Sequence, residues 1–148
     1  MKKVLFLSVM CLVALAINAQ TFVDLGLPSG TKWKKTNEQG LFTYEDAMGR
    51  FGKQIPTKKQ CDELIKKCDW KWTGRGFDVV GPNGESIFMP ALGYRDCSGY
   101  QEEVGFGQYW TSTPDGEYRT WLLIILSSGA MTTNNDQCGE FSVRLVKN

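Results

Sequence analysis

Acidic and amide side chains that could do chemistry gather in the last third of the chain. Asp115, Glu117, Asn134, Asn135 and Asp136 offer oxygen atoms, and calcium takes roughly six to eight such oxygens. The same residue types are common in turns and solvated loops. The chain has no His and no closely spaced Cys pair to add soft metal ligands. We therefore expect neither a metal site nor a cofactor.

Catalysis by a histidine-activated nucleophile is excluded, because the chain contains no His. Carboxylates stand close in sequence at Glu102 and Glu103, at Asp115 and Glu117, and at Asp136 and Glu140. Acid–base catalysis needs two carboxyl groups that face each other across a cleft, with their pKa values pushed apart. Carboxylates that are merely close in sequence within polar loops indicate neither a shared cleft nor separated pKa values. A non-enzymatic function is favoured, and a carboxylate-using hydrolase or modifying enzyme is the alternative.

Aromatic side chains could supply the apolar part of a sugar site, since sugars stack on exposed Trp or Tyr rings. Four tryptophans fall in segments with regular patterning and are expected in the core: Trp33, Trp70, Trp72 and Trp110. Tyr94, Tyr100 and Tyr118 lie in or beside expected loops. These tyrosines are the better candidates for ligand contacts.

Four cysteines follow the N-terminal region, namely Cys61, Cys68, Cys97 and Cys138, and they allow three complete pairings. On an intact helix Cys61 and Cys68 would lie about 10 Å apart, beyond the roughly 7 Å limit for bridged Cα atoms. That excludes one pairing and leaves the others open. We predict a single Cys97–Cys138 disulfide, with Cys61 and Cys68 as small apolar residues of the core.

The N-terminus has the features of a secretory signal peptide. Lys2 and Lys3 precede an apolar stretch over residues 4–16, and Ala19 supplies a small residue at the cleavage site. The stretch is too short to span a bilayer. We expect cleavage between Ala19 and Gln20, one domain over residues 20–148, and no transmembrane segment in that mature chain. The product would be secreted, periplasmic or part of the cell envelope.

The charge balance gives no support for a nucleic-acid partner. Lys and Arg number 17 against 16 Asp and Glu, for a formal net charge of +1. Phosphate backbones are bound by concentrated basic faces. No such concentration is visible along this chain.

The clearest local signal is a helix that begins after Thr57. Thr57 can cap the first turn and Gln60 can reach back to the cap, which makes a capping box. An apolar stripe follows at helical spacing and is expected to face the core: Cys61, Leu64, Ile65 and Cys68. A shorter helix is expected from Thr43 to Gly52, with Asp46 in its first turn.

Short strand patterns fill the remainder of the chain. A hairpin is expected where Gly81-Pro82-Asn83-Gly84 separates two strands. The run from Trp121 to Leu126 is apolar on both sides, which predicts a central strand covered on both faces. Loops are expected over residues 92–107 and 134–139, and an alternating strand over residues 141–146. The fold class is α+β, with two helices packed on a small twisted antiparallel sheet.

Six stretches of the chain resemble one known family. They are residues 22–33 (FVDLGLPSGTKW), 56–58 with 63–64 (PTK and EL), 81–84 (GPNG), 93–96 (GYRD), 109–114 (YWTSTP) and 141–146 (FSVRLV). They resemble the Fibrobacter succinogenes major paralogous domain family, exported proteins of Fibrobacter and Bacteroides relatives. This family is similar to C-type lectin-like folds, to the formylglycine-generating enzyme and to retroelement-diversified variable domains. Its usual large aromatic in the Pro-Thr helix is Cys61 here.

The resemblance implies a C-type lectin-like fold whose first and last strands are adjacent, and no established activity comes with it. Ligand contacts in the diversified relatives come from the segment that here lies between Pro114 and Glu140. With the loop aromatic Tyr94 added, the candidate site residues are Tyr94, Asp115, Tyr118, Arg119, Thr132, Asn134, Asn135 and Asp136. The lectin calcium signatures Glu-Pro-Asn and Trp-Asn-Asp are missing. We expect a non-catalytic binding module for a glycan or cell-surface protein; a purely structural envelope domain is a further alternative.

Overall fold

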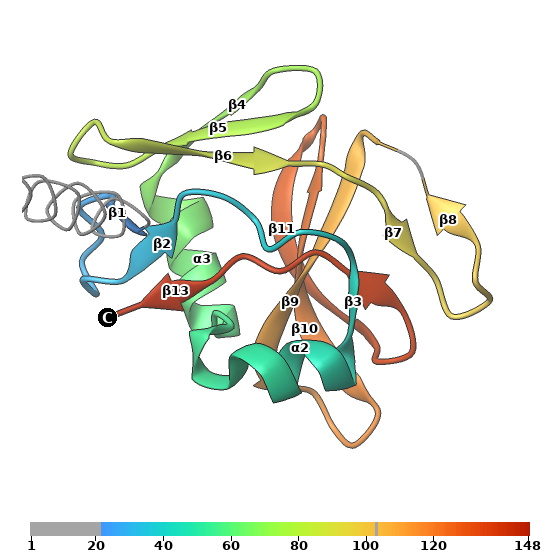
Figure 1. The fold of residues 1–148 in the computed structure, drawn as a ribbon. Coiled ribbons are helices and arrows are strands. Elements are labelled where there is room, and N and C mark those ends of the chain that lie inside the picture. The colour runs from blue at the N-terminus through green and yellow to red at the C-terminus, as the bar shows by residue number, and fades with distance from the viewer. Residues whose placement is uncertain (1–21, 103) are drawn as a thin grey trace, which may run out of the picture.

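The computed structural model describes residues 22–102 and 104–148 (Figure 1). The signal peptide predicted over residues 1–19 lies outside these residues. The helices are α2 (Tyr44–Phe51), the 3-10 helix η1 (Gly52–Gln54) and α3 (Lys58–Lys67). The first strands are β1 (Phe22–Asp24), β2 (Lys32–Lys34), β3 (Phe42–Thr43), β4 (Asp69–Trp72), β5 (Gly76–Val80) and β6 (Ser86–Pro90). The later strands are β7 (Tyr94–Arg95), β8 (Gln101–Glu102), β9 (Phe106–Pro114), β10 (Arg119–Leu126), β11 (Gly129–Asp136), β12 (Glu140–Phe141) and β13 (Val146–Lys147).

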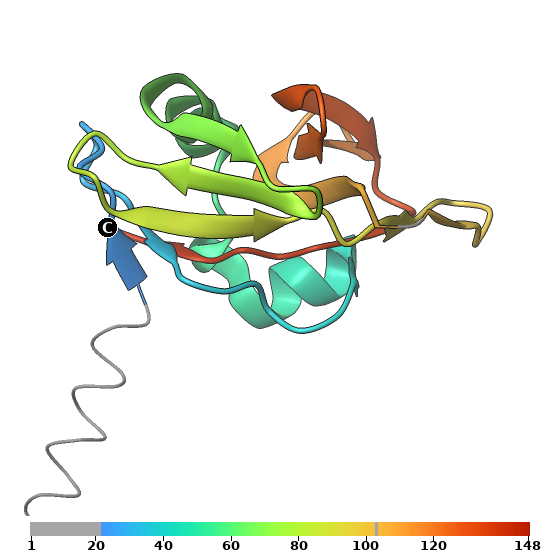
Figure 2. The same cartoon turned by 90° about the horizontal axis from the view of Figure 1, so that it is seen from above.

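The predicted α+β class is confirmed, but the strands do not form one sheet. In the described residues they are distributed over sheets ordered β1-β2-β13, β11-β10-β9, β3-β12-β7-β8 and β4-β5-β6, and all named strand pairs are antiparallel. The first and last strands share one sheet, but the expectation that they are adjacent is wrong, because β2 pairs with both and lies between them. In both views the β7–β8 hairpin lies at the end of the molecule opposite β13 (Figures 1 and 2). None of the described helices is long and apolar enough to cross a membrane.

Both helices begin where the sequence predicts. The Thr57 side chain accepts a hydrogen bond from the Gln60 N–H, and the Gln60 side chain accepts one from the Thr57 N–H, which completes the capping box of α3. Thr43 caps α2 in the same way through the Asp46 N–H. On the predicted stripe of α3, Cys61 and Leu64 are fully buried. This stripe faces the β9–β10–β11 sheet, because α3 packs against all three of its strands.

Strand β10 is a central strand with apolar contacts on both faces, as predicted. Leu123 and Ile125 belong to the core cluster that contains Cys61 of α3. Leu122, directed to the opposite face, belongs to the second cluster with Trp110. The continuous apolar run therefore reflects burial on two sides rather than a helix segment.

The β5–β6 hairpin also forms as predicted. Val80 pairs with Ser86, and the intervening turn closes through a hydrogen bond from the Gly84 N–H to the Gly81 carbonyl. Gly84 has a φ of 88°, a backbone conformation that favours glycine. Trp70 and Trp72 of the neighbouring β4 are half-buried against the core, whereas Trp33 and Trp110 are completely buried.

Three strand predictions are wrong in part. The loop expected over residues 92–107 contains the short β7–β8 hairpin and the first residues of β9. The loop expected from Asn134 is strand as far as Asp136, because β11 keeps an unbroken register with β10 up to the Arg119–Asp136 pair. The closing strand is interrupted between β12 and β13, and its expected alternation fails because Ser142 and Arg144 are as buried as their neighbours.

Arg144 is the most polar group in the interior, with 1% of its surface exposed. Its Nε donates to Asn37 Oδ1 at 2.7 Å, and its Nη1 donates to the carbonyl oxygens of Lys34 and Lys35. Its Nη2 donates to the Phe88 carbonyl oxygen of β6 at 2.6 Å. One side chain thus joins the C-terminal segment to the β2–β3 connection and to β6.

We predict that Arg144→Met lowers the free energy of unfolding by at least about 3 kcal/mol, because several part-buried acceptors would lose their donor. Lys35→Met, an exposed cation beside it, is the matched control and should change stability by less than about 0.5 kcal/mol. Urea titration monitored by tryptophan fluorescence measures both. Equal effects of the two substitutions would contradict the structural importance of Arg144.

We also predict that the free thiols are unreactive in the folded protein. Burial raises the pKa of Cys68 from 9.0 to about 11, with the nearby carboxylate of Asp69 adding to the effect. Burial, with Asp62, raises the pKa of Cys61 far above its usual range. Because only thiolate reacts, Ellman's reagent at pH 8 should label neither thiol until guanidinium unfolds the chain, when both should react. Rapid labelling of the native protein would refute this burial.

Candidate functional site

The Cys97–Cys138 disulfide is present, as predicted, and it joins two turns that are distant in sequence. Cys97 lies in the β7–β8 turn and Cys138 in the β11–β12 turn, with their Cα atoms 5.0 Å apart and a sequence separation of 41. Both cysteines are exposed. The bond therefore holds two surface turns together at one end of the molecule (Figure 1).

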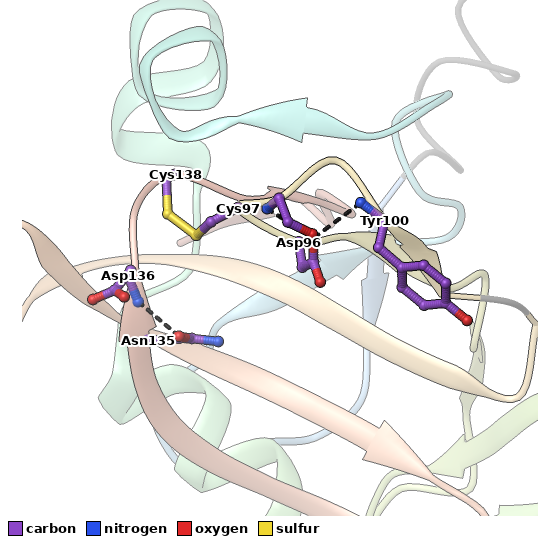
Figure 3. The surroundings of a disulfide bond; sticks show 7 residues. Asp96, Cys97, Tyr100, Asn135, Asp136 and Cys138 are labelled. Carbon is purple, nitrogen blue, oxygen red and sulfur yellow. Dashed lines mark hydrogen bonds between the residues drawn. A yellow bond between two sulfur atoms is a disulfide. The ribbon is translucent and has the colours of Figure 1, made fainter.

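A pocket of about 300 Å³ opens beside this bond, and we call it the disulfide pocket. Its lining residues are Tyr94, Asp96, Cys97, Ser98, Asn135, Asp136, Gly139 and Phe141. Three predicted site residues, Tyr94, Asn135 and Asp136, thus meet in one place. Figure 3 shows Asn135 and Asp136 on the strand below the disulfide and Asp96 on the facing turn.

Asp96 organises the β7–β8 turn on one side of the pocket. Its Oδ1 accepts hydrogen bonds from the Ser98 N–H, the Ser98 hydroxyl and the Tyr100 N–H, at 2.9, 2.7 and 3.0 Å. The bond from the Ser98 hydroxyl, assisted by the backbone N–H groups, holds the pKa of Asp96 below its ordinary value. The ring of Tyr100, which is 63% exposed, points away from the disulfide in Figure 3.

The other side of the pocket is the end of β11 and the turn that follows. Asn135 and Asp136 are fixed by strand pairing with Thr120 and Arg119. The Asn135 Oδ1 accepts a hydrogen bond from the Asp136 N–H at 2.8 Å, and the amide nitrogen of Asn135 makes no hydrogen bond among the described residues. At Gly139 any Cβ would lie 2.5 Å from Phe141 Cζ, so only glycine allows this approach.

Aromatic rings form the inner wall of the pocket, and acidic groups set its charge. The Tyr94 ring packs 5.9 Å from Phe141, between ring centroids. Burial raises the pKa of Tyr94, and the negative charges of Glu102 and Asp96 raise it further. The nearby cation Arg95 is already paired with Glu140 at 3.0 Å. The pocket is therefore acidic.

The other predicted site residues lie outside the disulfide pocket. The Asn134 side chain donates to Asp115 Oδ2, and the Arg119 guanidinium donates to Asn134 Oδ1 at 2.7 Å. The Thr132 hydroxyl donates to Asp62 Oδ1 of α3. Tyr118 lies in the β9–β10 turn, outside the disulfide pocket, and is 72% exposed. Most of these polar atoms are bonded within the protein, which makes them poorer ligand contacts than the pocket residues.

The geometry of the pocket also bears on whether the site could hold a metal ion or act as an acid–base catalyst. The sulfur atoms of Cys97 and Cys138 lie within 4.8 Å of a carboxylate oxygen of Asp136. These sulfurs are bonded to each other and offer no thiolate to a metal. The carboxylate pairs suggested by sequence are partly engaged elsewhere, since Asp115 accepts from Asn134 and Glu140 pairs with Arg95. Glu103 lies outside the described residues.

Sequence reasoning missed four lining residues: Asp96, Ser98, Gly139 and Phe141. A signal for them was present, because a disulfide between Cys97 and Cys138 necessarily brings the residues on either side of each cysteine together. No protein-family model, curated protein or solved structure matches the chain.

We predict that replacing both pocket cysteines, Cys97→Ala with Cys138→Ala, lowers the free energy of unfolding by about 2–4 kcal/mol. The chain-entropy cost of closing a loop of this length in the unfolded state sets that scale. Hydrogen exchange should quicken selectively at the amides of Ser98 and Tyr100, which depend on the Asp96 turn. An unchanged unfolding midpoint together with unchanged exchange at these amides would contradict the prediction.

Proposed function

We propose that the chain is an exported, non-catalytic binding module that recognises a glycan through the disulfide pocket. The observation that carries this proposal is the meeting of Tyr94, Asn135 and Asp136 in one pocket. Tyr94 comes from β7 and the other two residues from β11, and a disulfide joins the turns that follow these two strands. A site that is already rigid loses little entropy when it binds.

The free polar groups of the pocket suit sugar hydroxyls, which donate and accept hydrogen bonds at once. The Asp136 carboxylate offers acceptors, and the Asn135 amide nitrogen offers donors. Tyr94 and Phe141 supply aromatic surface against which the apolar face of a sugar ring packs. Because Asp96 and Asp136 make the pocket acidic, neutral or amino sugars are the favoured ligands and acidic sugars are disfavoured.

The proposal extends to the fold and to export. We propose a C-type lectin-like fold and membership of the major paralogous domain family. Supporting features are the two helices and the antiparallel strands, whereas β2 separates the terminal strands that the resemblance implies to be adjacent. Export is supported by the N-terminal sequence and by the disulfide, since disulfides persist mainly in oxidising compartments.

A carboxylate-using hydrolase is the competing proposal, because Asp96 and Asp136 line the same pocket. A general acid needs a carboxyl group whose pKa is raised by its surroundings. The pKa of Asp96 is instead lowered by its hydrogen bonds to Ser98 and Tyr100. This difference favours binding over acid–base catalysis. A structural envelope domain is the remaining alternative, and it would need no ligand.

We predict that the chain from Gln20 onward binds neutral or amino-sugar glycans on an array, and that Asn135→Ala with Asp136→Ala weakens binding at least about tenfold. Two lost hydrogen-bonding side chains account for this magnitude. Asp69→Ala, at an exposed position of β4, removes the same charge elsewhere and should leave binding unchanged.

Four results would count against the proposal. Unchanged binding in the double variant would exclude the disulfide pocket as the site. Preference for acidic glycans would contradict its charge. Failure of every glycan on the array would favour the structural alternative, while glycan cleavage that is lost in Asp136→Asn would favour the hydrolase.

A further inference from the structure

A second cavity, of about 370 Å³, opens between the β2–β3 connection and β6. Its lining residues are Lys35, Thr36, Asn37, Asp78, Ser86, Ile87, Phe88, Pro90 and Arg144. It shares no lining residue with the disulfide pocket. The cavity therefore belongs to a different part of the surface and needs a separate explanation.

The buried guanidinium of Arg144 lines this cavity. Its hydrogen-bond acceptors are all uncharged: the Asn37 side-chain oxygen and the carbonyl oxygens of Lys34, Lys35 and Phe88. One Nη2 N–H has no acceptor among the described residues. Burial lowers the pKa of Arg144 to about 10, which leaves it protonated at neutral pH. A buried cation whose acceptors are all neutral attracts an anion strongly, because burial weakens screening.

The rim of the cavity adds positive charge and free hydroxyl groups. Lys35, Thr36 and Ser86 are exposed, and their side chains make no hydrogen bond among the described residues. Asp78 is the one carboxylate in the lining, and it lies opposite Lys71 of β4 in the strand register. The lining thus carries more positive than negative charge.

The wall formed by β6 is apolar and extends past the cavity. Phe88 is 40% exposed although its neighbours Ile87 and Met89 are buried. Phe88 and Pro90 also line an adjoining cavity of about 500 Å³, whose other lining residues are Arg75, Leu92 and Val104. Leu92 and Val104 are 46% and 63% exposed. The two cavities share Phe88 and Pro90 and form one groove along β6. The groove has an apolar wall, with the buried Arg144 and the exposed Lys35 in one cavity and the exposed Arg75 in the other.

We propose that this groove binds a small organic acid with an apolar body. The carboxylate would face Arg144 and Lys35, where it could accept hydrogen bonds from Thr36 and Ser86. An aromatic or branched aliphatic body would pack on Phe88 and Pro90. The positive charge of the groove favours a carboxylate, and its apolar wall favours an apolar body on the same molecule. An inorganic anion would make only the first of these two interactions.

Titration of the mature chain with 3-phenylpropionate, followed by chemical-shift changes, tests the proposal. We expect a dissociation constant on the order of millimolar, the scale of a ligand with few heavy atoms. The uncharged 3-phenylpropanamide and inorganic phosphate should each bind at least about tenfold more weakly, because each lacks one of the two interactions. If 3-phenylpropanamide binds as tightly as 3-phenylpropionate, the proposed role of Arg144 is wrong. If phosphate binds as tightly as 3-phenylpropionate, the proposed role of the apolar wall is wrong.

Exposed residues supply variants that leave Arg144 and the fold intact. Phe88→Ala should weaken binding of 3-phenylpropionate roughly tenfold through lost apolar contact, and Lys35→Gln roughly two- to fivefold. Asp78→Asn should strengthen it by about twofold or more, because it removes the opposing charge. Asn135→Ala with Asp136→Ala should have no effect. Weaker binding in Asp78→Asn, or no change in Phe88→Ala, would refute the site.

Discussion

The assembly of this fold depends on hydrogen bonds from a few buried side chains, and those of Arg144 matter most. The small sheets of the described residues share no continuous ladder, and their backbones meet at isolated bridges such as Tyr109 with Ser142. Side-chain hydrogen bonds therefore add to the contacts that fix how the sheets sit together. Arg144 holds β6 against the β2–β3 connection, and Asn37 extends the contact by donating to the Tyr109 hydroxyl, which itself donates to the Pro90 carbonyl. Because Arg144 is buried and its hydrogen bonds are part-buried, a displaced sheet would leave several polar groups unsatisfied. This penalty makes one relative placement of the sheets strongly preferred.

The same reasoning connects the core to the disulfide pocket. The segment after β12 is tied to β9 by hydrogen bonds from the Ser142 N–H to the Gln108 carbonyl and from the Trp110 N–H to the Ser142 carbonyl. The Trp110 ring packs 4.4 Å from Phe141, so β12 is fixed by both backbone and side chain. The turn that carries Cys138 immediately precedes β12. The disulfide therefore joins the exposed β7–β8 turn to a turn whose base is already held by the core.

Features set by neighbouring residues were predictable from the sequence, and features set by distant partners were not. The Thr57–Gln60 capping box needs only one turn of chain, and it forms as expected. Arg144 occupies an alternating segment that predicts exposure, and only the remote carbonyls of Lys34 and Phe88 make its burial possible. The residues 134–136 have the composition of a loop, yet pairing with β10 makes them strand. The polar composition of a segment indicates its local conformational preference, and pairing along a long neighbouring strand overrides that preference.

That last difference explains why the predicted site divides into two groups. In a loop, Asn134, Asn135 and Asp136 could all turn toward one ligand. In a strand, successive side chains point to opposite faces. Asn134 accordingly bonds to Asp115 and Arg119, whereas Asn135 lines the disulfide pocket with Tyr94 and Phe141. Asp136 reaches the pocket because it ends β11, where the chain turns toward Cys138. The geometry of β11, more than the chemistry of its side chains, decides which predicted residues can share a ligand.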